Sequence, residues 1–216
     1  MVDPFNPLTV PNLALTLALE LLEQPVHSLP PKQSFRGAGI YAIYYLGDFE
    51  AYRKLVRKNK AELCKAPIYV GRAVREGSRK GISFSPAESP SVYKRLGNHA
   101  KSIAQTTLKI EHFRCRFLVV EDSFIDLAES VLIALFRPLW NQVVDGFGNN
   151  PTGGPRSGQR QSDWDILHPG RRRGMGKARI STHQIEKKVQ SHLGKTATEN
   201  VDAELQRIAS RVKKYY

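Results

Sequence analysis

Cysteine is scarce in this chain, which has two cysteines, Cys64 and Cys115, among 216 residues. Neither has a Cys or His partner at the close spacing of zinc ligands, so the sequence predicts no zinc site. Two cysteines also do not make a disulfide scaffold, and a reducing cytoplasm is the expected compartment. The sequence therefore argues against a disulfide-rich secreted protein and against a zinc finger.

The apolar run near the N-terminus is too short to span a membrane. It covers residues 13–22 and is interrupted by a threonine and a glutamate, whereas a spanning helix needs about 20 apolar residues. Asp3 precedes the run and no basic leader does, so it does not resemble a signal peptide. We expect an internal helix packed on the body of the protein, and no membrane partner.

Acidic residues are few relative to basic ones. The chain has 33 Lys and Arg against 20 Asp and Glu, which gives a formal net charge of +13 at pH 7 and a pI of about 9.9. Such a charge favours a polyanionic partner, and nucleic acid is the commonest one. A basic housekeeping protein with a solvated surface is the alternative that composition leaves open.

The pattern of apolar residues predicts an α+β fold, a small mixed β-sheet flanked by helices. Strands are expected at 39–46, 68–70 and 113–120, and helices at 11–23, within 49–65, at 91–105, before Pro138 and at 198–213. Residues 73–91 are rich in Gly, Ser, Pro and basic types and predict a long loop.

Three segments follow from this order. Residues 1–36 are predicted to be an N-terminal helical extension, and 37–141 a catalytic core with insertions at 47–66 and 73–91. Residues 142–216 are expected to form a basic, loop-rich arm with C-terminal helices.

Two tripeptides and four later residues carry a family resemblance. Gly39-Ile40-Tyr41 and Tyr69-Val70-Gly71 are followed, in order, by Arg95, His99, Glu129 and Asn141. This set is similar to that of the GIY-YIG nuclease superfamily, although valine replaces the usual isoleucine and the connection between the strands is longer. The segments 26–30, 143–148 and 162–165 resemble one type II restriction endonuclease branch, which cuts short GC-rich palindromes of the CCGCGG type.

Glu129, Arg95 and His99 each allow two interpretations without the resemblance. A carboxylate on an apolar helix needs a partner, which is either a salt bridge or a divalent cation. Arg95 and His99 are four residues apart and share a helix face, which is either a solvated face with a satisfied histidine or a phosphate-binding one. In the second case Arg95 steadies the transition state and His99 accepts a proton.

The remaining candidates are Tyr41, Tyr69 and Asn141. A tyrosine in an apolar strand is most often a core residue, but its buried hydroxyl needs a polar partner and can hold an attacking water. The ordinary tyrosine pKa of about 10 makes Tyr41 a poor base without help. Asn141 is either a C-cap or turn residue, or a brace for the site through hydrogen bonds.

The resemblance implies a type II restriction endonuclease that hydrolyses phosphodiester bonds in duplex DNA and leaves 5′-phosphates. It implies Mg²⁺ (or Mn²⁺) on Glu129, a homodimer on a palindrome, a cognate DNA methyltransferase as genetic partner and a bacterial cytoplasm. A catalytically inactive DNA- or RNA-binding protein and a repair or homing nuclease are the alternatives. The basic side chains expected to contact DNA are Arg72, Arg75, Arg79 and Lys80.

Overall fold

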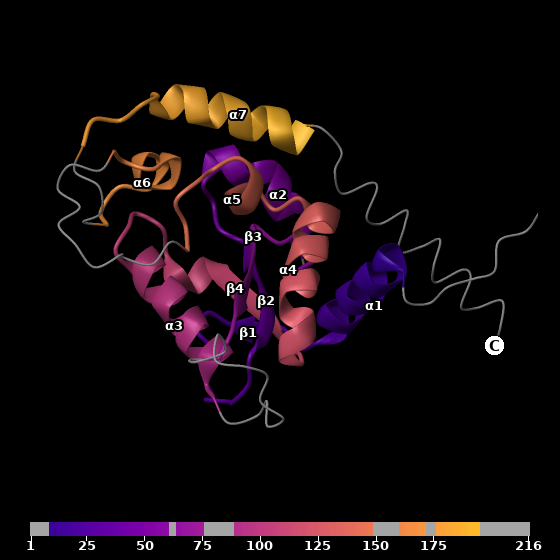
Figure 1. The fold of residues 1–216 in the computed structure, drawn as a ribbon. Coiled ribbons are helices and arrows are strands. Elements are labelled where there is room, and N and C mark those ends of the chain that lie inside the picture. Colours follow the sequence, from indigo (N-terminus) through magenta and orange to yellow (C-terminus); the bar gives the residue numbers. More distant parts are fainter. Residues whose placement is uncertain (1–8, 61–63, 76–88, 149–159, 172–175, 195–216) are drawn as a thin grey trace, which may run out of the picture.

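The structure is a computed structural model that describes residues 9–60, 64–75, 89–148, 160–171 and 176–194. A four-stranded sheet lies at its centre with the strand order β1-β4-β2-β3 (Figure 1). The strands are β1 (His27–Ser28), β2 (Gly39–Tyr45), β3 (Tyr69–Ala73) and β4 (Phe113–Val119). The α+β class predicted from the sequence is confirmed.

The sheet is antiparallel, whereas the sequence predicted a mixed one. β2 pairs antiparallel with both β3 and β4, and β1 pairs antiparallel with β4. The apolar pattern does not carry this information, because a strand buried on both faces shows a continuous apolar run whichever way its neighbours run. All seven residues of β2 are buried, and the strand lies between β4 and β3.

Alternation along β2 divides the core into two halves, because successive side chains of a strand point to opposite faces. Tyr41, Ile43 and Tyr45 pack into one hydrophobic cluster, on what we call the first face. The second face carries the residues between them, among them Ala42 and Tyr44, in a separate cluster. The two clusters have different helices above them.

Figure 1 shows α3 on one side of the sheet and α1 with α4 on the other. Helix α3 (Ser91–Ala104) covers the first face with Val92, Leu96 and Ile103. Helices α1 (Val10–Glu23) and α4 (Asp122–Phe136) cover the second face. These three helices agree with the sequence prediction to within a few residues. Among the described helices, none is both long and apolar enough to cross a membrane.

The other described helices gather at one end of the sheet (Figure 1). They are η1 (Glu50–Tyr52), α2 (Arg53–Lys58), α5 (Leu139–Gln142), α6 (Asp163–Leu167) and α7 (Thr182–Gly194), while η5 (Ile110–His112) leads into β4. Helix α7 lies in the segment where C-terminal helices were expected, although no range was predicted for it, and the helix predicted at 198–213 lies outside the described residues.

A buried chain of hydrogen bonds ties α6 to this end of the core. Trp140 Nε1 donates to Tyr52 Oη over 2.9 Å, and Tyr52 Oη lies 2.6 Å from His168 Nε2. Burial lowers the pKa of His168 to about 3, so this histidine is neutral at physiological pH. The described part of the arm is therefore packed into the core rather than lying as a separate loop.

Candidate active site

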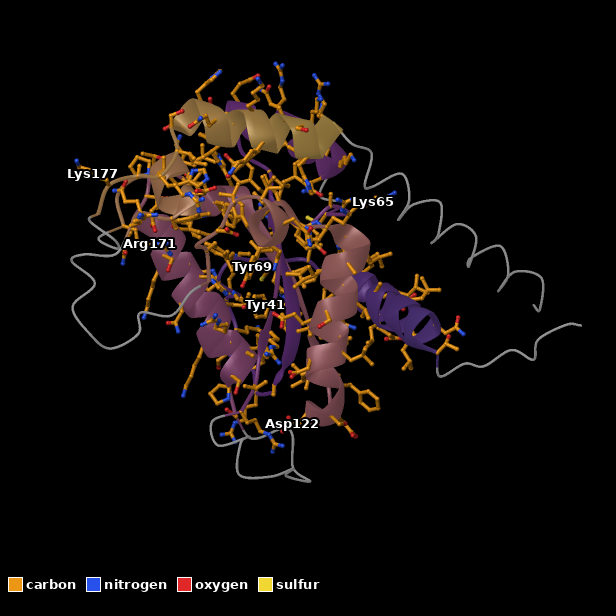
Figure 2. The ribbon with its side chains drawn as sticks, turned by 45° about the horizontal axis from the view of Figure 1, so that its top comes forward. Tyr41, Lys65, Tyr69, Asp122, Arg171 and Lys177 are labelled. Atoms are coloured by element: carbon orange, nitrogen blue, oxygen red, sulfur yellow. The ribbon has the colours of Figure 1, made fainter. Side chains whose placement is uncertain are left out.

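The two tripeptides face each other across neighbouring strands. In the register between β2 and β3, Tyr41 lies opposite Gly71, and Ile43 lies opposite Tyr69. Alternation then places Tyr41 and Tyr69 on the first face, 6.3 Å apart between ring centroids, and Figure 2 shows them close together near the middle of the molecule. A Cβ at Gly71 would lie 2.5 Å from Tyr41 Oη, so only glycine leaves room for this hydroxyl.

Helix α3 brings His99 to the two tyrosines. Its Nε2 lies 2.7 Å from Tyr41 Oη, and its ring is edge-on to Tyr69 at 5.3 Å. The residue is 3 % exposed, so His99 is a buried residue with a hydrogen-bond partner and does not lie on a solvated part of the helix. A neutral imidazole has one nitrogen that accepts, so the tautomer with its proton on Nδ1 accepts from the tyrosine.

Arg95 lies one helical turn before His99 and is half-buried. Its Nη2 donates to the carbonyl oxygen of Gly148 over 2.5 Å. The positive charge of Arg95 lowers the pKa values of both Tyr41 and Tyr69, so the guanidinium acts on the same cluster. The interpretation of Arg95 as part of a merely solvated face is therefore not supported.

Burial nevertheless dominates the acidity of the two tyrosines. It raises the pKa of Tyr41 well above its ordinary value, and the neighbouring Tyr69 adds to this increase while Arg95 opposes it. The pKa of Tyr69 is also raised, first by burial, with Arg95 again opposing. Both phenols are therefore protonated at neutral pH in the free protein.

Asn141 holds strand β3 in place. Its Oδ1 accepts from the backbone N–H of Val70 over 2.9 Å, and its Nδ2 donates to the carbonyl of Val70 over 2.8 Å. The side chain thus replaces a neighbouring strand on the open edge of β3, next to Tyr69. Asn141 lies inside the short helix α5 and not at a C-cap or in a turn.

Glu129 projects from α4 and has an arginine partner. Its Oε2 lies 2.8 Å from Nε of Arg72 on β3, and Arg72 also pairs with Asp126, one helical turn earlier. Burial raises the pKa of Glu129, and Arg72 and then Arg95 lower it. Its charge acts on both tyrosines, so Glu129 belongs to the same electrostatic neighbourhood.

The chemistry of Glu129 fits a magnesium ion. Mg²⁺ in nucleotide-binding sites is typically held by one or two carboxylates, with the rest of its shell made of water and substrate phosphates. The Glu129 side chain is 23 % exposed, so its carboxylate is accessible from one side. Among the described residues, no group of three or more His, Cys, Asp and Glu side chains gathers to hold a metal.

Two of the four predicted DNA-contacting side chains pair with carboxylates of α4. Arg72 pairs with Glu129 and Asp126, and Nε of Arg75 lies 2.9 Å from Oδ2 of Asp122. Arg79 and Lys80 lie outside the described residues. The structure therefore shows the first two arginines engaged at the edge of the sheet, where Asp122, Asp126 and Glu129 form one stripe of α4.

Phe147 and Gly148 were not among the predicted site residues, yet both contact the cluster. The Phe147 ring stacks on His99 with 4.7 Å between centroids and an interplanar angle of 24°. Gly148 has a φ of +79°, and a Cβ there would lie 2.5 Å from Tyr69 Oη. The glycines around Phe147 were the available signal, because such close approaches favour glycine.

One protein family, described as the Eco29kI GIY-YIG domain, matches residues 33–193 of this chain. The match covers the tyrosines, α3, Glu129 and Asn141, and continues through the described part of the arm. Among curated proteins, none matches the chain.

Proposed function

This chain belongs to the family of the Eco29kI GIY-YIG domain, a family of type II restriction endonucleases, and on that premise we propose a function for its site. The proposed reaction is hydrolysis of phosphodiester bonds within a short palindromic site in duplex DNA, with a divalent metal as cofactor. The observation that carries the proposal is the contact between Tyr41 and His99 at 2.7 Å, inside a cluster that also holds Tyr69 and Arg95.

The Tyr41–His99 contact supports a proton relay. Water gives a proton to Tyr41 Oη while Tyr41 gives its own proton to Nε2 of His99, and the resulting hydroxide attacks phosphorus. The bond from phosphorus to the 3′ oxygen then breaks, and the 3′ oxygen takes up a proton from solvent water while His99 returns its own proton to solvent. The phosphate stays on the 5′ end of the other fragment. Because burial raises the pKa of Tyr41, this tyrosine is a poor free phenolate base. A relay in which it gains one proton as it gives up the other suits it better.

Arg95 and Glu129 take complementary roles in the proposal. The guanidinium is a planar, permanently charged fork that matches phosphate oxygens, and its bond to the Gly148 carbonyl fixes its direction. Glu129 would hold Mg²⁺ or Mn²⁺, which when bound supplies charge neutralisation at the phosphate. Asn141 keeps β3 and therefore Tyr69 in position through Val70.

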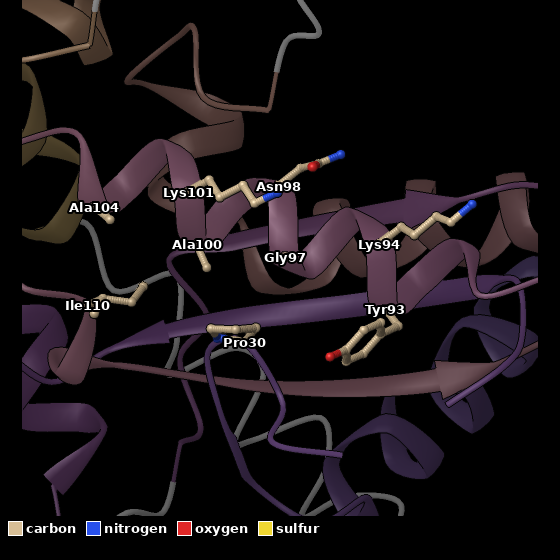
Figure 3. Close-up of a pocket in the computed structure, with 9 residues that line it drawn as sticks. All are labelled: Pro30, Tyr93, Lys94, Gly97, Asn98, Ala100, Lys101, Ala104 and Ile110. Carbon is tan, nitrogen blue, oxygen red and sulfur yellow. The ribbon is translucent and has the colours of Figure 1, made fainter. Parts of the chain in front are cut away.

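The exposed side of α3 offers a surface for the DNA backbone. Lys94, Asn98 and Lys101 are exposed and spaced for one helix face, and Figure 3 shows their nitrogen-bearing ends on the same side of the helix. They border a groove of about 650 Å³ whose described lining holds two lysines and no acidic side chain. A Cβ at Gly97 would meet nothing within 4 Å, so the surface of α3 is open at this position.

We also propose the partners of this chain, with the family as the support. A palindromic site is most simply read by a twofold dimer, so we propose a homodimer on DNA. A restriction enzyme of this type needs a cognate DNA methyltransferase to protect the host genome, and both would act in the bacterial cytoplasm. We propose that bases are recognised by loop 73–91 and by residues 145–174 within the arm, which supply arginines for guanine edges.

One experiment tests the proposal. The full-length protein is incubated with phage DNA in the presence and absence of Mg²⁺, and the fragment ends are sequenced. We expect 5′-phosphate ends at a single short palindrome, only with the metal. Binding without any cleavage would instead indicate an inactive DNA-binding protein, and ends scattered over unrelated sequences would indicate a repair-type nuclease.

A further inference from the structure

A short turn of the arm contacts the two α3 residues of the site. The turn is residues 145–148, and it places the Phe147 ring on His99 and the Gly148 carbonyl on Arg95. Phe147 also meets Tyr69 edge-on at 4.9 Å. Whatever fixes this turn therefore fixes the orientation of His99 and Arg95.

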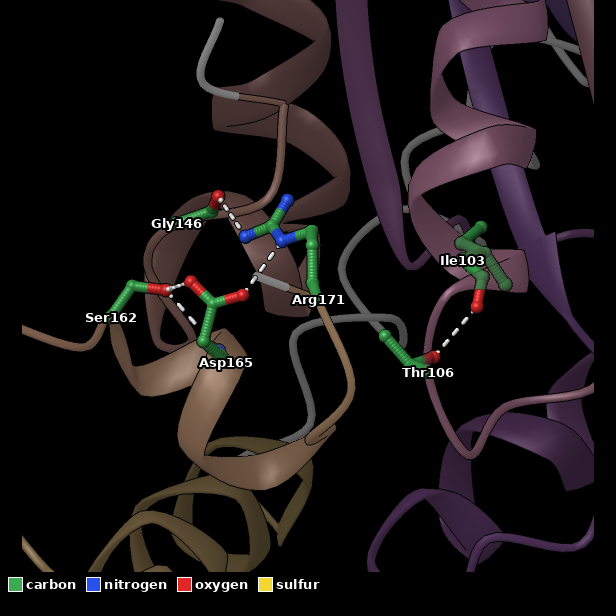
Figure 4. A network of polar contacts seen from close by, with 6 residues as sticks. All are labelled: Ile103, Thr106, Gly146, Ser162, Asp165 and Arg171. Carbon is green, nitrogen blue, oxygen red and sulfur yellow. Dashed lines mark hydrogen bonds and ion pairs between the residues drawn. The ribbon is translucent and has the colours of Figure 1, made fainter. Parts of the chain in front are cut away.

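The turn is held by side chains from the segment after it. Arg171 Nη2 donates to the carbonyl of Gly146 over 3.1 Å, and Arg171 Nε donates to Asp165 Oδ1 over 2.7 Å (Figure 4). Ser162 Oγ donates to the other oxygen of Asp165 over 2.6 Å. A Cβ at Gly146 would lie 2.0 Å from Ser162 Oγ, so the turn and this network are in direct contact.

The Arg171–Asp165 ion pair is buried, with side-chain exposures of 2 % and 7 %. Burying two charges is unfavourable unless their geometry is good and other hydrogen bonds satisfy them. Apolar residues of similar volume often stabilise a fold equally well, so stability alone does not explain such a pair. Arg171 also lies over the Trp164 ring, 4.4 Å from its centroid. The ion pair thus fixes the position of Gly146, because the planar guanidinium bonds Asp165 and the Gly146 carbonyl at fixed angles.

We propose that Arg171, braced by Asp165 and Ser162, is a positioning residue for catalysis that acts through the turn 145–148. It keeps Phe147 stacked on His99 and the Gly148 carbonyl on Arg95, so that the proton acceptor and the phosphate-binding fork hold their orientations. This inference rests on the proposed function. It extends the catalytic unit beyond the segment 37–141 into the arm.

The test is Arg171→Lys in the full chain, because lysine keeps the charge beside Asp165 but lacks the fork that reaches Gly146. Two quantities are measured: the ¹H NMR shift of the His99 ring proton on Cε1, assigned with His99→Gln, and the single-turnover cleavage rate. We expect the upfield shift caused by the stacked Phe147 ring to be lost. The rate should fall ~10–100-fold, with the dissociation constant for DNA unchanged.

Phe147→Leu and Arg116→Lys complete the design. Phe147→Leu removes the stacked ring without touching the ion pair and should reproduce both changes. Arg116 is a buried arginine that bonds the carbonyls of Gln24 and Cys64 on the second face, so Arg116→Lys should lower stability alone. If Arg171→Lys leaves the His99 signal and the rate per folded molecule unchanged, or if Arg116→Lys alters them equally, the inference is overturned.

Failure of the proposed function has a different signature. If the wild-type protein does not cut DNA, the proposed reaction is contradicted and no cleavage rate can be compared. The NMR shift of His99 still reports whether Arg171 sets its contact with Phe147, because it needs no substrate.

Discussion

Tyr41 and Tyr44 lie three residues apart on β2, on opposite faces of the sheet, and both are fully buried. Burial raises the pKa of both, that of Tyr44 to about 12. Their neighbours differ. Tyr41 touches His99, which can take a proton, whereas the Tyr44 hydroxyl meets Arg116 at 3.5 Å, and Arg116 is anchored to backbone carbonyls.

Burial and residue type alone therefore do not make a tyrosine a candidate for catalysis. The first face joins a proton acceptor and a permanently charged fork, Arg95, to its tyrosines. After burial, two thiols raise the pKa of Tyr44: Cys64, which packs on the second face, and Cys115, which packs on the first. Glu129 is the exception, because α4 covers the second face yet delivers this carboxylate to the edge at β3.

The largest expected effect is that of Glu129→Gln, which tests this exception. We expect at least ~10³-fold slower cleavage, because a metal supplies several kcal/mol at the phosphate and each 1.36 kcal/mol is a factor of ten. The control is Asp126→Asn, since Asp126 also pairs with Arg72 but is 76 % exposed. The measurement is the single-turnover cleavage rate of both variants with Mg²⁺. If the two substitutions slow cleavage equally, Glu129 is not a metal ligand of the site.

The same variant carries a pH signature. The pKa of Glu129 is higher in the folded protein than the ordinary value. Its charged form therefore lowers the free energy of unfolding above the folded pKa, and this loss of stability disappears as the pH falls. Glu129→Gln should therefore be at least as stable as wild type at neutral pH, with the difference vanishing toward pH 4.5, the ordinary value. Urea unfolding across this range measures it, and a destabilised variant at neutral pH would contradict the sign.

The second prediction compares the two tyrosines directly. Tyr41→Phe should slow cleavage by ~10²-fold or more, the low end for a positioned proton-transfer group. Tyr44→Phe should leave the rate of folded protein unchanged and lower the free energy of unfolding by about 1 kcal/mol, the usual value for one hydrogen bond. Equal cleavage rates for the two variants would contradict the conclusion that only the tyrosine on the first face takes part in catalysis.

The smallest expected effect concerns the outer side of α3. Lys94→Gln with Lys101→Gln should reduce the slope of log affinity against log salt by about 1.8, or about 0.9 for each phosphate contact. The matched control is Lys54→Gln with Lys187→Gln, exposed lysines of α2 and α7, which lie at one end of the sheet and not on its α3 side. Binding of a duplex is followed by fluorescence anisotropy; identical slopes for the two pairs would mean that this side of α3 does not contact DNA.

Local patterns in the sequence predicted much of this molecule. The unbroken apolar run of β2 predicted a buried strand, and the spacing of Val92, Leu96, His99 and Ile103 predicted α3 and its buried face. Arg95 and His99, four residues apart, had to share a side of that helix because of the helical period. The net charge of +13 likewise follows from composition and indicates a polyanionic partner.

Long-range pairing was decided only by the tertiary structure. The antiparallel register sets Tyr41 against Gly71, and no local pattern specifies which residue of one strand faces which residue of another. The partners of Arg72 on α4, the two bonds from Asn141 to Val70 and the Phe147–His99 stack join residues that are far apart in the chain. The sequence determined which groups are available for the chemistry, and packing in three dimensions decided which of them touch.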